Sequence, residues 1–363
     1  MKLFIAGGCG EHRRNSFLLD DKDECLLIDC GKGEESFCFP QLNKEQIRKI
    51  RYLFLTHSHN DHSGGIEWLI ENGFHGGIIS TEESRTQCKI YYDNWNILPV
   101  TEQMPLSRQF DSSLCIRYGR SGHCIGSIWY LIEWNHKKVF FTGDYKENSP
   151  VYICDKIRNI STDCAVIDCA YGNMKIDTVK LEKELLNTIK NMIHAGKSVC
   201  MPIPKFGRGL EILQTLKKLK NEFLVYADRN IYEQVMQKNS LWINTSVVSV
   251  RLLETWNGEP AVLFVSDPQL RKKENYELAV NINKDGGIIL LTGHVYPDTG
   301  SERLLKRRYA MQILYPVHMN YQEVCDFVKK NHISNVVLNH YAGEIYDKNH
   351  IALGVNTGTT IEF

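Results

Sequence analysis

Four side chains of the kinds that bind metal ions lie within six residues of one another early in the chain. They are His57, His59, Asp61 and His62, and they stand between a hydrophobic strand-like segment and a helical run that begins at Ile66. Because His57 and His59 are two residues apart on an extended strand end, they point the same way and can share one ion. Asp61 and His62 follow after the chain has turned toward the helix, where they can hold a second ion. A polar loop rich in His by chance explains this run poorly, because sites commonly form at strand-to-helix junctions.

Ions bound in this way would supply hydrolytic chemistry. A single ion with an open coordination position lowers the pKa of a bound water to about 7, which gives a nucleophile at neutral pH. Two ions roughly 3.5–4 Å apart can hold a bridging hydroxide and also neutralise the anionic group that it attacks, which suits a phosphodiester. A pair ligated by neutral imidazoles and two carboxylates stays net positive, so we expect an anionic substrate.

Length and composition describe the protein that must position these residues. The 363 residues exceed one typical domain, so we expect two domains or one core with a large insertion. Hydrophobic residues at 43% and charged residues at 24% exclude a disordered, collagen-like or coiled-coil chain. Forty-three basic residues balance forty-three acidic ones, which excludes a global positive field for nucleic acid or anionic lipid. Any polyanion site must therefore be local.

We expect a cytoplasmic protein with no membrane contact. No apolar stretch approaches the roughly 18 residues of a membrane span, and the opening segment lacks the long apolar region of a signal peptide. The twelve cysteines are scattered and form no Cys-x-x-Cys pair, which indicates buried thiols in a reducing compartment.

Strands and helices are predicted to alternate along the chain. Short apolar segments predict strands at 2–6, 16–19 and 25–28, and residues 128–133 and 138–142 flank Asn135-His136 as in a hairpin. From Thr178 apolar residues recur at helical spacing until Gly196, which stands where a C-terminal cap belongs. Later segments predict strands at 199–203, 223–226, 261–265, 287–291 and 336–339, and helices at 210–219, 231–237 and 321–330. This alternation favours a small parallel α/β unit in the second half.

The His-x-His-x-Asp-His run resembles the signature of the metallo-β-lactamase superfamily of metallohydrolases. The resemblance implies further ligands in a fixed order, and the chain supplies them. His123 lies in the loop Ser-Gly-His-Cys-Ile-Gly-Ser at 121–127, and Asp144 ends the segment Phe-Phe-Thr-Gly-Asp. Taken alone, His123 would be an ordinary loop histidine and Asp144 a turn residue, but their order and context favour ligands.

The remaining length resembles the β-CASP branch of this superfamily. A small lactonase or thioesterase would be complete in about 200–250 residues, which leaves 173–314 unexplained. Residues 203–211 (Ile-Pro-Lys-Phe-Gly-Arg-Gly-Leu-Glu) look like the start of the β-CASP cap, and 166–172, 317–321 and 337–340 resemble motifs A, B and C, the last followed by Gly343-Glu344. Motif B departs from the family pattern Ser-x-His-x-Asp, because this chain has Pro-Val-His-Met-Asn at 316–320. The opening residues 7–11 and 14–16 also resemble ribonuclease J and its relatives.

The resemblance implies an α/β fold, namely a metallo-β-lactamase αββα sandwich with an inserted α/β β-CASP cap domain. The sandwich would comprise residues 1–172 and 315–363, and the cap residues 173–314. Two zinc ions are expected, although manganese or iron would satisfy the same ligands. One ion would be bound by His57, His59 and His123, the other by Asp61, His62 and His340, with Asp144 between them.

The resemblance also implies a catalytic dyad. Asp168 would orient and charge the imidazole of His318, which would protonate or hydrogen-bond the departing oxygen, a role suited to a side chain that titrates near neutrality. The residues expected to take part in catalysis are Asp61, Asp144, Asp168 and His318.

A second anion site is expected in the cap. There a strand ending near Leu291 runs into a Gly-containing loop, with Ser301 as the cap of a following helix, and exposed backbone N–H groups would suit phosphate. Residues 205–238 hold seven Lys and Arg against four acids, which modestly favours a nucleic-acid track over a solvated face. The predicted substrate-binding residues are Lys205, Arg208, His294, Thr299, Gly300 and Ser301.

The leading functional hypothesis is a metal-dependent ribonuclease that hydrolyses phosphodiester bonds through a di-metal-bridged hydroxide. In the family a His at motif C is associated with RNA processing, so His340 favours RNA, with single-strand DNA as an alternative. Neutral charge and a short cap leave open a hydrolase of a small anionic ester or signalling nucleotide. A scaffold protein without activity is a third reading, against which the presence of all seven expected ligands argues.

Overall fold

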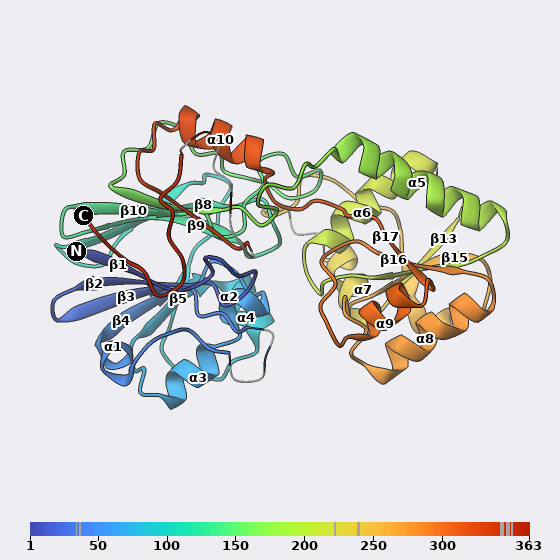
Figure 1. The fold of residues 1–363 in the computed structure, drawn as a ribbon, viewed down its shortest axis with the longest axis horizontal. Helices are drawn as coiled ribbons and strands as arrows, with labels where there is room; N and C mark the ends of the chain where they lie inside the picture. The colour runs from blue at the N-terminus through green and yellow to red at the C-terminus, as the bar shows by residue number, and fades with distance from the viewer. Residues whose placement is uncertain are drawn as a thin grey trace. The chain divides into compact units, whose positions relative to one another are not determined.

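The computed structural model describes residues 1–363 except 34, 36–37, 221–222, 238–239, 342–344, 346–348 and 350. Gly343 and Glu344, which follow the expected motif C, lie outside the described residues. The chain divides into two units (Figure 1), and each is described by itself. The first comprises Met1–Lys175 with His318–Phe363, and the second comprises Ile176–Val317.

Two sheets form the centre of the first unit. In spatial order, one contains β19 (Thr360–Glu362), β1 (Lys2–Gly7), β2 (Ser16–Asp21), β3 (Glu24–Ile28), β4 (Ile50–Phe54), β5 (Gly77–Thr81) and β6 (Trp95–Leu98). The other contains β18 (Val336–Asn339), β11 (Cys164–Asp168), β10 (Lys137–Phe141), β9 (Ile128–Trp134), β8 (Leu114–Arg120) and β7 (Leu106–Gln109). Aromatic rings from both sheets meet between them, because the Phe17 and Phe141 centroids lie 6.1 Å apart and those of Phe54 and Tyr130 5.5 Å apart.

Helices cover the outer faces of these two sheets. Ile47 of α1 (Lys44–Lys49) and Leu69 of α3 (Ile66–Glu71) are buried in one cluster with Leu53 of β4. Phe327 of α10 (Tyr321–Lys330) is buried in another with Phe140 of β10. Two further short helices, α2 (Asn60–Ser63) and α4 (Glu82–Cys88), follow β4 and β5 along the chain. The expected metallo-β-lactamase αββα layering is therefore confirmed.

The predicted hairpin joins β9 to β10. The strands pair antiparallel, with Lys137 opposite Trp134. The two connecting residues, Asn135 and His136, have φ values of 47° and 64°, as a two-residue turn that matches the strand twist requires.

The second unit is built on one parallel sheet. In spatial order it contains β14 (Arg251–Leu252), β13 (Leu224–Ala227), β15 (Ala261–Val265), β12 (Val199–Pro202), β16 (Ile288–Leu291) and β17 (Ala310–Gln312), and every neighbouring pair is parallel. The helices are α5 (Thr178–His194), α6 (Arg208–Leu216), α7 (Arg229–Met236), α8 (Lys273–Lys284) and α9 (Gly300–Lys306), with short 3-10 turns at Lys217–Leu219 and Leu253–Thr255.

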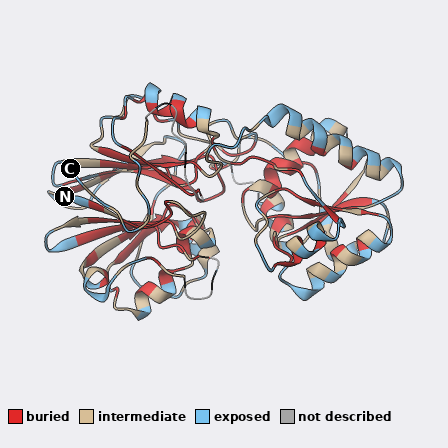
Figure 2. Cartoon of the chain, viewed as in Figure 1, coloured by how far each residue is buried: buried red, intermediate tan, exposed pale blue. Residues whose placement is uncertain are grey.

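Both faces of this sheet are buried. Successive strand residues point to opposite faces, so neighbours along one strand belong to different hydrophobic clusters. Met201 belongs to the cluster beneath α5, α6 and α7, whereas Cys200 belongs to the cluster beneath α8 and α9. Figure 2 shows the same division, with buried residues along the strands and exposed ones on the outer sides of the helices. The predicted parallel α/β unit is thus present, with its own core.

Helix α5 ends in a C-terminal cap at Gly196, as the sequence predicted. Gly196 has a φ of 72° and donates to Ile193 O, while Lys197 donates to Met192 O, which together form a Schellman motif. An added Cβ at Gly196 would meet nothing within 4 Å, so only the left-handed backbone opposes a side chain there.

We expect Gly196→Ala to destabilise the protein by about 1 kcal/mol through this backbone strain. Gly354→Ala is the matched control, because Gly354 also has open space around it but no left-handed φ. Urea unfolding followed by circular dichroism would measure both, and equal midpoints for the two variants would contradict the assignment.

Candidate metal centre

The topology of the second sheet of the first unit brings distant residues to one edge. Strand β10 is parallel to β11, and β11 is parallel to β18, so their C-terminal ends lie at the same side. Asp144 follows β10, Asp168 ends β11 and His340 follows β18. The other sheet supplies His57 and His59 after β4, and α2 carries Asp61 and His62. The loop between β8 and β9 supplies His123.

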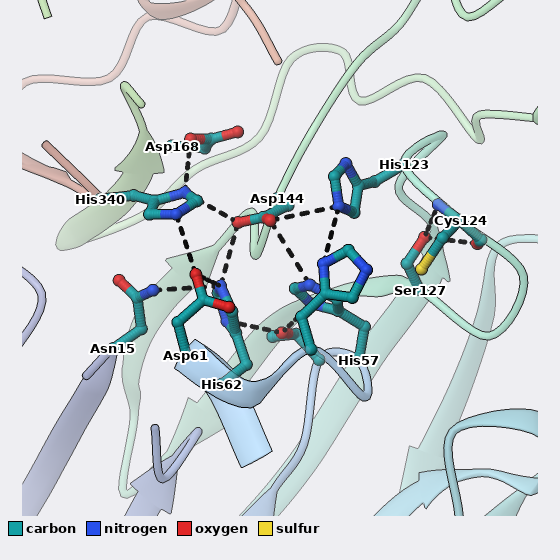
Figure 3. Close-up of polar contacts among 12 residues, drawn as sticks. Asn15, His57, Asp61, His62, His123, Cys124, Ser127, Asp144, Asp168 and His340 are labelled. Atoms are coloured by element: carbon teal, nitrogen blue, oxygen red, sulfur yellow. Dashed lines mark hydrogen bonds and ion pairs between the residues drawn. The ribbon is translucent and has the colours of Figure 1, made fainter. Parts of the chain in front are cut away.

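Ligand atoms at this edge form three groups, and Figure 3 shows many of the residues involved. One of the three consists of Asp144, Asp168, His318 and His340. The other two hold the seven predicted ligands. His57, His59, His123 and Asp144 each offer one atom, and these atoms all lie within 4.8 Å of one another. Asp61, His62 and His340 meet the same criterion. The predicted seven ligands are therefore brought together, in the two groups that the resemblance implies.

The Asp144 carboxylate lies between the two groups. Its Oδ2 is 3.4 Å from His57 Nε2 and 3.3 Å from His123 Nε2. Its Oδ1 is 3.1 Å from His62 Nε2 and 3.1 Å from His340 Nδ1. One oxygen faces each group, which is the arrangement required of a bridging ligand.

Several buried polar atoms here form no hydrogen bond, although some of them lie within ion-pair distance of one another. They include His57 Nε2, His59 Nε2, Asp144 Oδ1 and His340 Nδ1. Buried polar atoms are normally paired, so such a group needs an explanation, and a cation at their convergence would provide one. Imidazole nitrogens with carboxylate oxygens suit divalent transition metals. The residues present therefore fit divalent metal ions.

The charged groups at the centre shift one another's pKa values. Burial alone raises the pKa of Asp144, but His340, His62 and two further imidazoles outweigh it and hold that pKa well below its usual value. Burial lowers the pKa of His59 to about 3 and that of His123 well below its usual value. Burial also acts to lower the pKa of His62 and His340, yet Asp144 and other carboxylates raise both well above the usual value. His59 and His123 thus offer neutral imidazoles, whereas a cation bound by His62 and His340 would displace protons from them.

A carboxylate that sequence reasoning missed lies behind His62. Asp29 Oδ2 is 2.7 Å from His62 Nδ1, and both side chains are buried. Asp29 also accepts hydrogen bonds from the backbone N–H and the hydroxyl of Thr56, each at 2.8 Å. Because Nδ1 of His62 faces Asp29, Nε2 is directed to the centre, the usual arrangement of a metal-ligating histidine. One feature of the sequence could have identified Asp29, because it follows the hydrophobic strand β3 as Asp144 follows β10.

Asn15 is a second missed neighbour of the centre. It is fully buried, its Nδ2 lies 3.1 Å from His62 Nε2, and its Oδ1 accepts from Asn339 Nδ2 at 3.1 Å. It lies in the opening stretch that resembles ribonuclease J, which was the signal for it.

The predicted dyad partners are in contact. His318 Nδ1 lies 2.8 Å from Asp168 Oδ2, and Asp168 is fully buried. Asp168 also accepts from the backbone N–H groups of Tyr145 and Ala170, at 3.0 and 3.1 Å. His340 Nδ1 is 3.4 Å from Asp168 Oδ1, which connects the dyad to the second group of ligands.

The six predicted substrate-binding residues all belong to the second unit. Lys205 follows β12, Arg208 begins α6 and His294 follows β16, while Thr299, Gly300 and Ser301 lie at the start of α9. An added Cβ on Gly293 would lie 2.3 Å from an Arg208 guanidinium nitrogen, so this guanidinium lies against the loop after β16. The part of these six residues in substrate binding stays a prediction.

The expectation that Ser301 caps the following helix is wrong. The N-cap is Thr299, whose hydroxyl accepts from Glu302 N at 3.2 Å. Ser301 instead uses its hydroxyl to donate to Pro268 O and its backbone N–H to donate to Gln269 O. The helix begins two residues earlier than expected, and the Ser301 donors are already used within the unit.

Comparison with known proteins agrees with this geometry. Residues 9–163 match the family model described as the metallo-beta-lactamase superfamily. The endoribonuclease YSH1 of Candida albicans is 22% identical, over 93% of this chain and 48% of that protein. The transcription termination factor FttA of Methanosarcina mazei is 27% identical, over 64% of this chain and 42% of that protein, and the probable RNase MJ4 of Methanocaldococcus jannaschii is 22% identical, over 80% and 72%. The chain thus spans about half the length of YSH1 and FttA.

A solved structure supports the fold over the whole chain. A protein of unknown function from Enterococcus faecalis V583 matches with a TM-score of 0.63 and 10% sequence identity, and the match covers 99% of both chains. At this identity the likeness bears on the fold alone.

The contact between Asp29 and His62 can be tested by metal titration. We expect Asp29→Asn to weaken binding of one of two ions by about 10–100-fold, because the charge that orients His62 is lost. Asparagine tolerates the φ of 56° at this position, so the backbone is spared.

Asp298→Asn is the control, because Asp298 also has a left-handed φ, of 59°, and is exposed outside the centre. Titration with zinc in chelator buffers would measure both variants. Wild-type affinity for both ions in Asp29→Asn would contradict the role given to Asp29.

Proposed function

We propose that this chain, a metallo-β-lactamase superfamily protein related to β-CASP nucleases, is a metal-dependent ribonuclease that hydrolyses phosphodiester bonds. The observation that carries the proposal is the buried Asp144 carboxylate, with one oxygen toward each of two ligand groups. The Asp168–His318 dyad beside it is the second support. The second unit, Ile176–Val317, would be the β-CASP cap that helps to hold the substrate.

The ions would be zinc, with manganese or iron as alternatives that suit the same ligands. His57, His59 and His123 would hold one, Asp61, His62 and His340 the other, and Asp144 would contact both. When bound, such a pair makes a water acidic enough to attack at neutral pH and offsets the charge of a phosphate group.

The dyad would serve the departing oxygen. Because His318 Nδ1 faces Asp168, the proton that His318 can give lies on its other ring nitrogen, Nε2. Asp168 is held by two backbone N–H groups, so it fixes the orientation of the ring.

RNA is the proposed substrate because relatives over most of this chain are named endoribonuclease and probable RNase. His340 at motif C favours the same choice. Single-strand DNA and small anionic esters or signalling nucleotides are the alternatives, since the formal net charge is zero. We propose the cytoplasm as its compartment, because all twelve cysteines are free thiols. In the described part of the chain, no helix combines the length and apolar character needed to cross a bilayer.

Oligonucleotide cleavage tests this proposal directly. We expect the zinc-loaded protein to cleave RNA in preference to DNA of the same sequence and to a cyclic dinucleotide, and a chelator to abolish the reaction. Substrates with 5′-phosphate, 5′-hydroxyl or hairpin ends, resolved on denaturing gels, would report direction and end requirement in the same assay.

Asp61→Ala with His62→Ala should abolish hydrolysis while the protein stays folded. Asp93→Ala with His75→Ala is the matched control, since both residues are exposed in the same unit. Undiminished RNA cleavage by the first double variant would refute the site assignment.

His318→Ala should lower kcat on RNA by about 10²–10⁴-fold, because a positioned acid for the departing oxygen is lost. The loss should be much smaller on a p-nitrophenyl phosphodiester, whose leaving group needs no proton. Bound metal, measured by mass spectrometry, should stay at the wild-type level. An equal loss on both substrates would argue against His318 as the acid.

A further inference from the structure

Two segments that each carry a ligand are packed backbone against backbone. One is the loop 121–127 with His123, and the other is the segment 144–157 that begins at Asp144. Lys146 N donates to Ser121 O at 3.0 Å, and Ser121 forms an isolated β-bridge with Cys154. An added Cβ on Gly122 would lie 2.2 Å from Lys146 O, so the two backbones approach as closely as glycine allows.

A buried ion pair also joins these two segments, between Arg120, just before the loop 121–127, and Asp155 of the segment 144–157. Arg120, the last residue of β8, donates from Nε to Asp155 Oδ2 at 2.8 Å and from a terminal nitrogen to Oδ1 at 2.7 Å. Its backbone N–H donates to Asp155 Oδ2 at 2.7 Å, and Asp155 N donates back to Arg120 O at 2.9 Å. The two side chains are only 6% and 8% exposed.

The same aspartate reaches the other end of the loop. Trp129 of β9 donates from Nε1 to Asp155 O at 2.9 Å. Asp155 therefore contacts the strand that enters the loop and the strand that leaves it. This ion pair is largely buried. Burying two charges is costly, and apolar side chains of similar size often give equal stability, so stability alone does not explain the pair.

We propose that Arg120 and Asp155 are positioning residues for the ion held by His57, His59 and His123. The pair fixes the loop 121–127 against the segment 144–157, and thereby fixes His123 relative to Asp144 Oδ2, 3.3 Å from its Nε2. This inference rests on the proposed metal-dependent function. The ion held by Asp61, His62 and His340 is expected to be affected little, because those ligands come from α2 and from the end of β18.

The test is zinc titration in chelator buffers, with folding followed by circular dichroism. Arg120→Met with Asp155→Leu replaces the pair by apolar side chains, a change that is often neutral for stability. It also removes the acceptor of the Arg120 backbone N–H. We expect one of two binding steps to weaken by about tenfold and the other to stay unchanged. His123→Ala identifies the affected step, because it should lose the same one.

Arg120→Lys is the conservative variant, and it should give an intermediate shift because lysine keeps the charge but not the two-point contact. It also decides the question if the double variant fails to fold. Arg51→Ala is the matched control, because it removes an Arg–Asp pair with Asp111 elsewhere in the same unit and should leave both steps unchanged.

The outcomes separate the two proposals. A wild-type protein that binds neither zinc nor manganese nor iron overturns the metal-dependent function itself. A wild-type protein that binds two ions, with a folded double variant or Arg120→Lys that binds both equally tightly, overturns the positioning role alone. A loss in Arg51→Ala as large as in the Arg120 variants would show a general effect of destabilisation and would also overturn it.

Discussion

The centre of the first unit depends on one buried charge. Asp144 is 2% exposed and its carboxylate faces imidazoles on both sides, so its ionised form is stabilised even though burial opposes it. An isolated carboxylate in such a place would take up a proton. The structure avoids this because three segments that are distant in sequence place histidines around the same carboxylate. The folding of the unit and the formation of the centre are therefore one requirement.

Parallel pairing of β11 and β18 allows the ligands to meet although the second unit is inserted between the two strands in sequence. Strands β11 and β18 are neighbours, with Asp168 opposite Asn339, although the second unit separates them in sequence. That unit has its own parallel sheet with buried clusters on both faces, so it needs no core residues from the first. The chain can leave the first unit after Lys175 and return at His318 without altering the register that places His340.

The sequence predicted the features that neighbouring residues specify, but it did not predict contacts between residues that are far apart in the chain. The His-x-His-x-Asp-His run, the hairpin turn at Asn135-His136 and the stop at Gly196 are each specified by neighbouring residues, and the structure has all three. Asp29 and the pair Arg120–Asp155 act across 33 and 35 residues, and a single carboxylate has no periodic signature. Helix α8 was missed because only a few of its residues, such as Ala279 and Ile282, are buried, which leaves a weak apolar pattern. At α9, two hydroxyl residues competed for one cap, and Thr299 rather than Ser301 has it.

Three imidazoles at the centre are held from behind by a group on the side away from it. Asp29 holds His62, Asp168 holds His318, and the Thr56 hydroxyl lies 3.1 Å from His57 Nδ1. These contacts select the ring nitrogen that faces inward and restrict rotation of the ring before any ion binds. The supporting groups are themselves fixed by backbone hydrogen bonds. The positions of the ligands are therefore set by the strands. A site preorganised in this way binds a cation with little further loss of conformational entropy, because folding has already ordered its ligands.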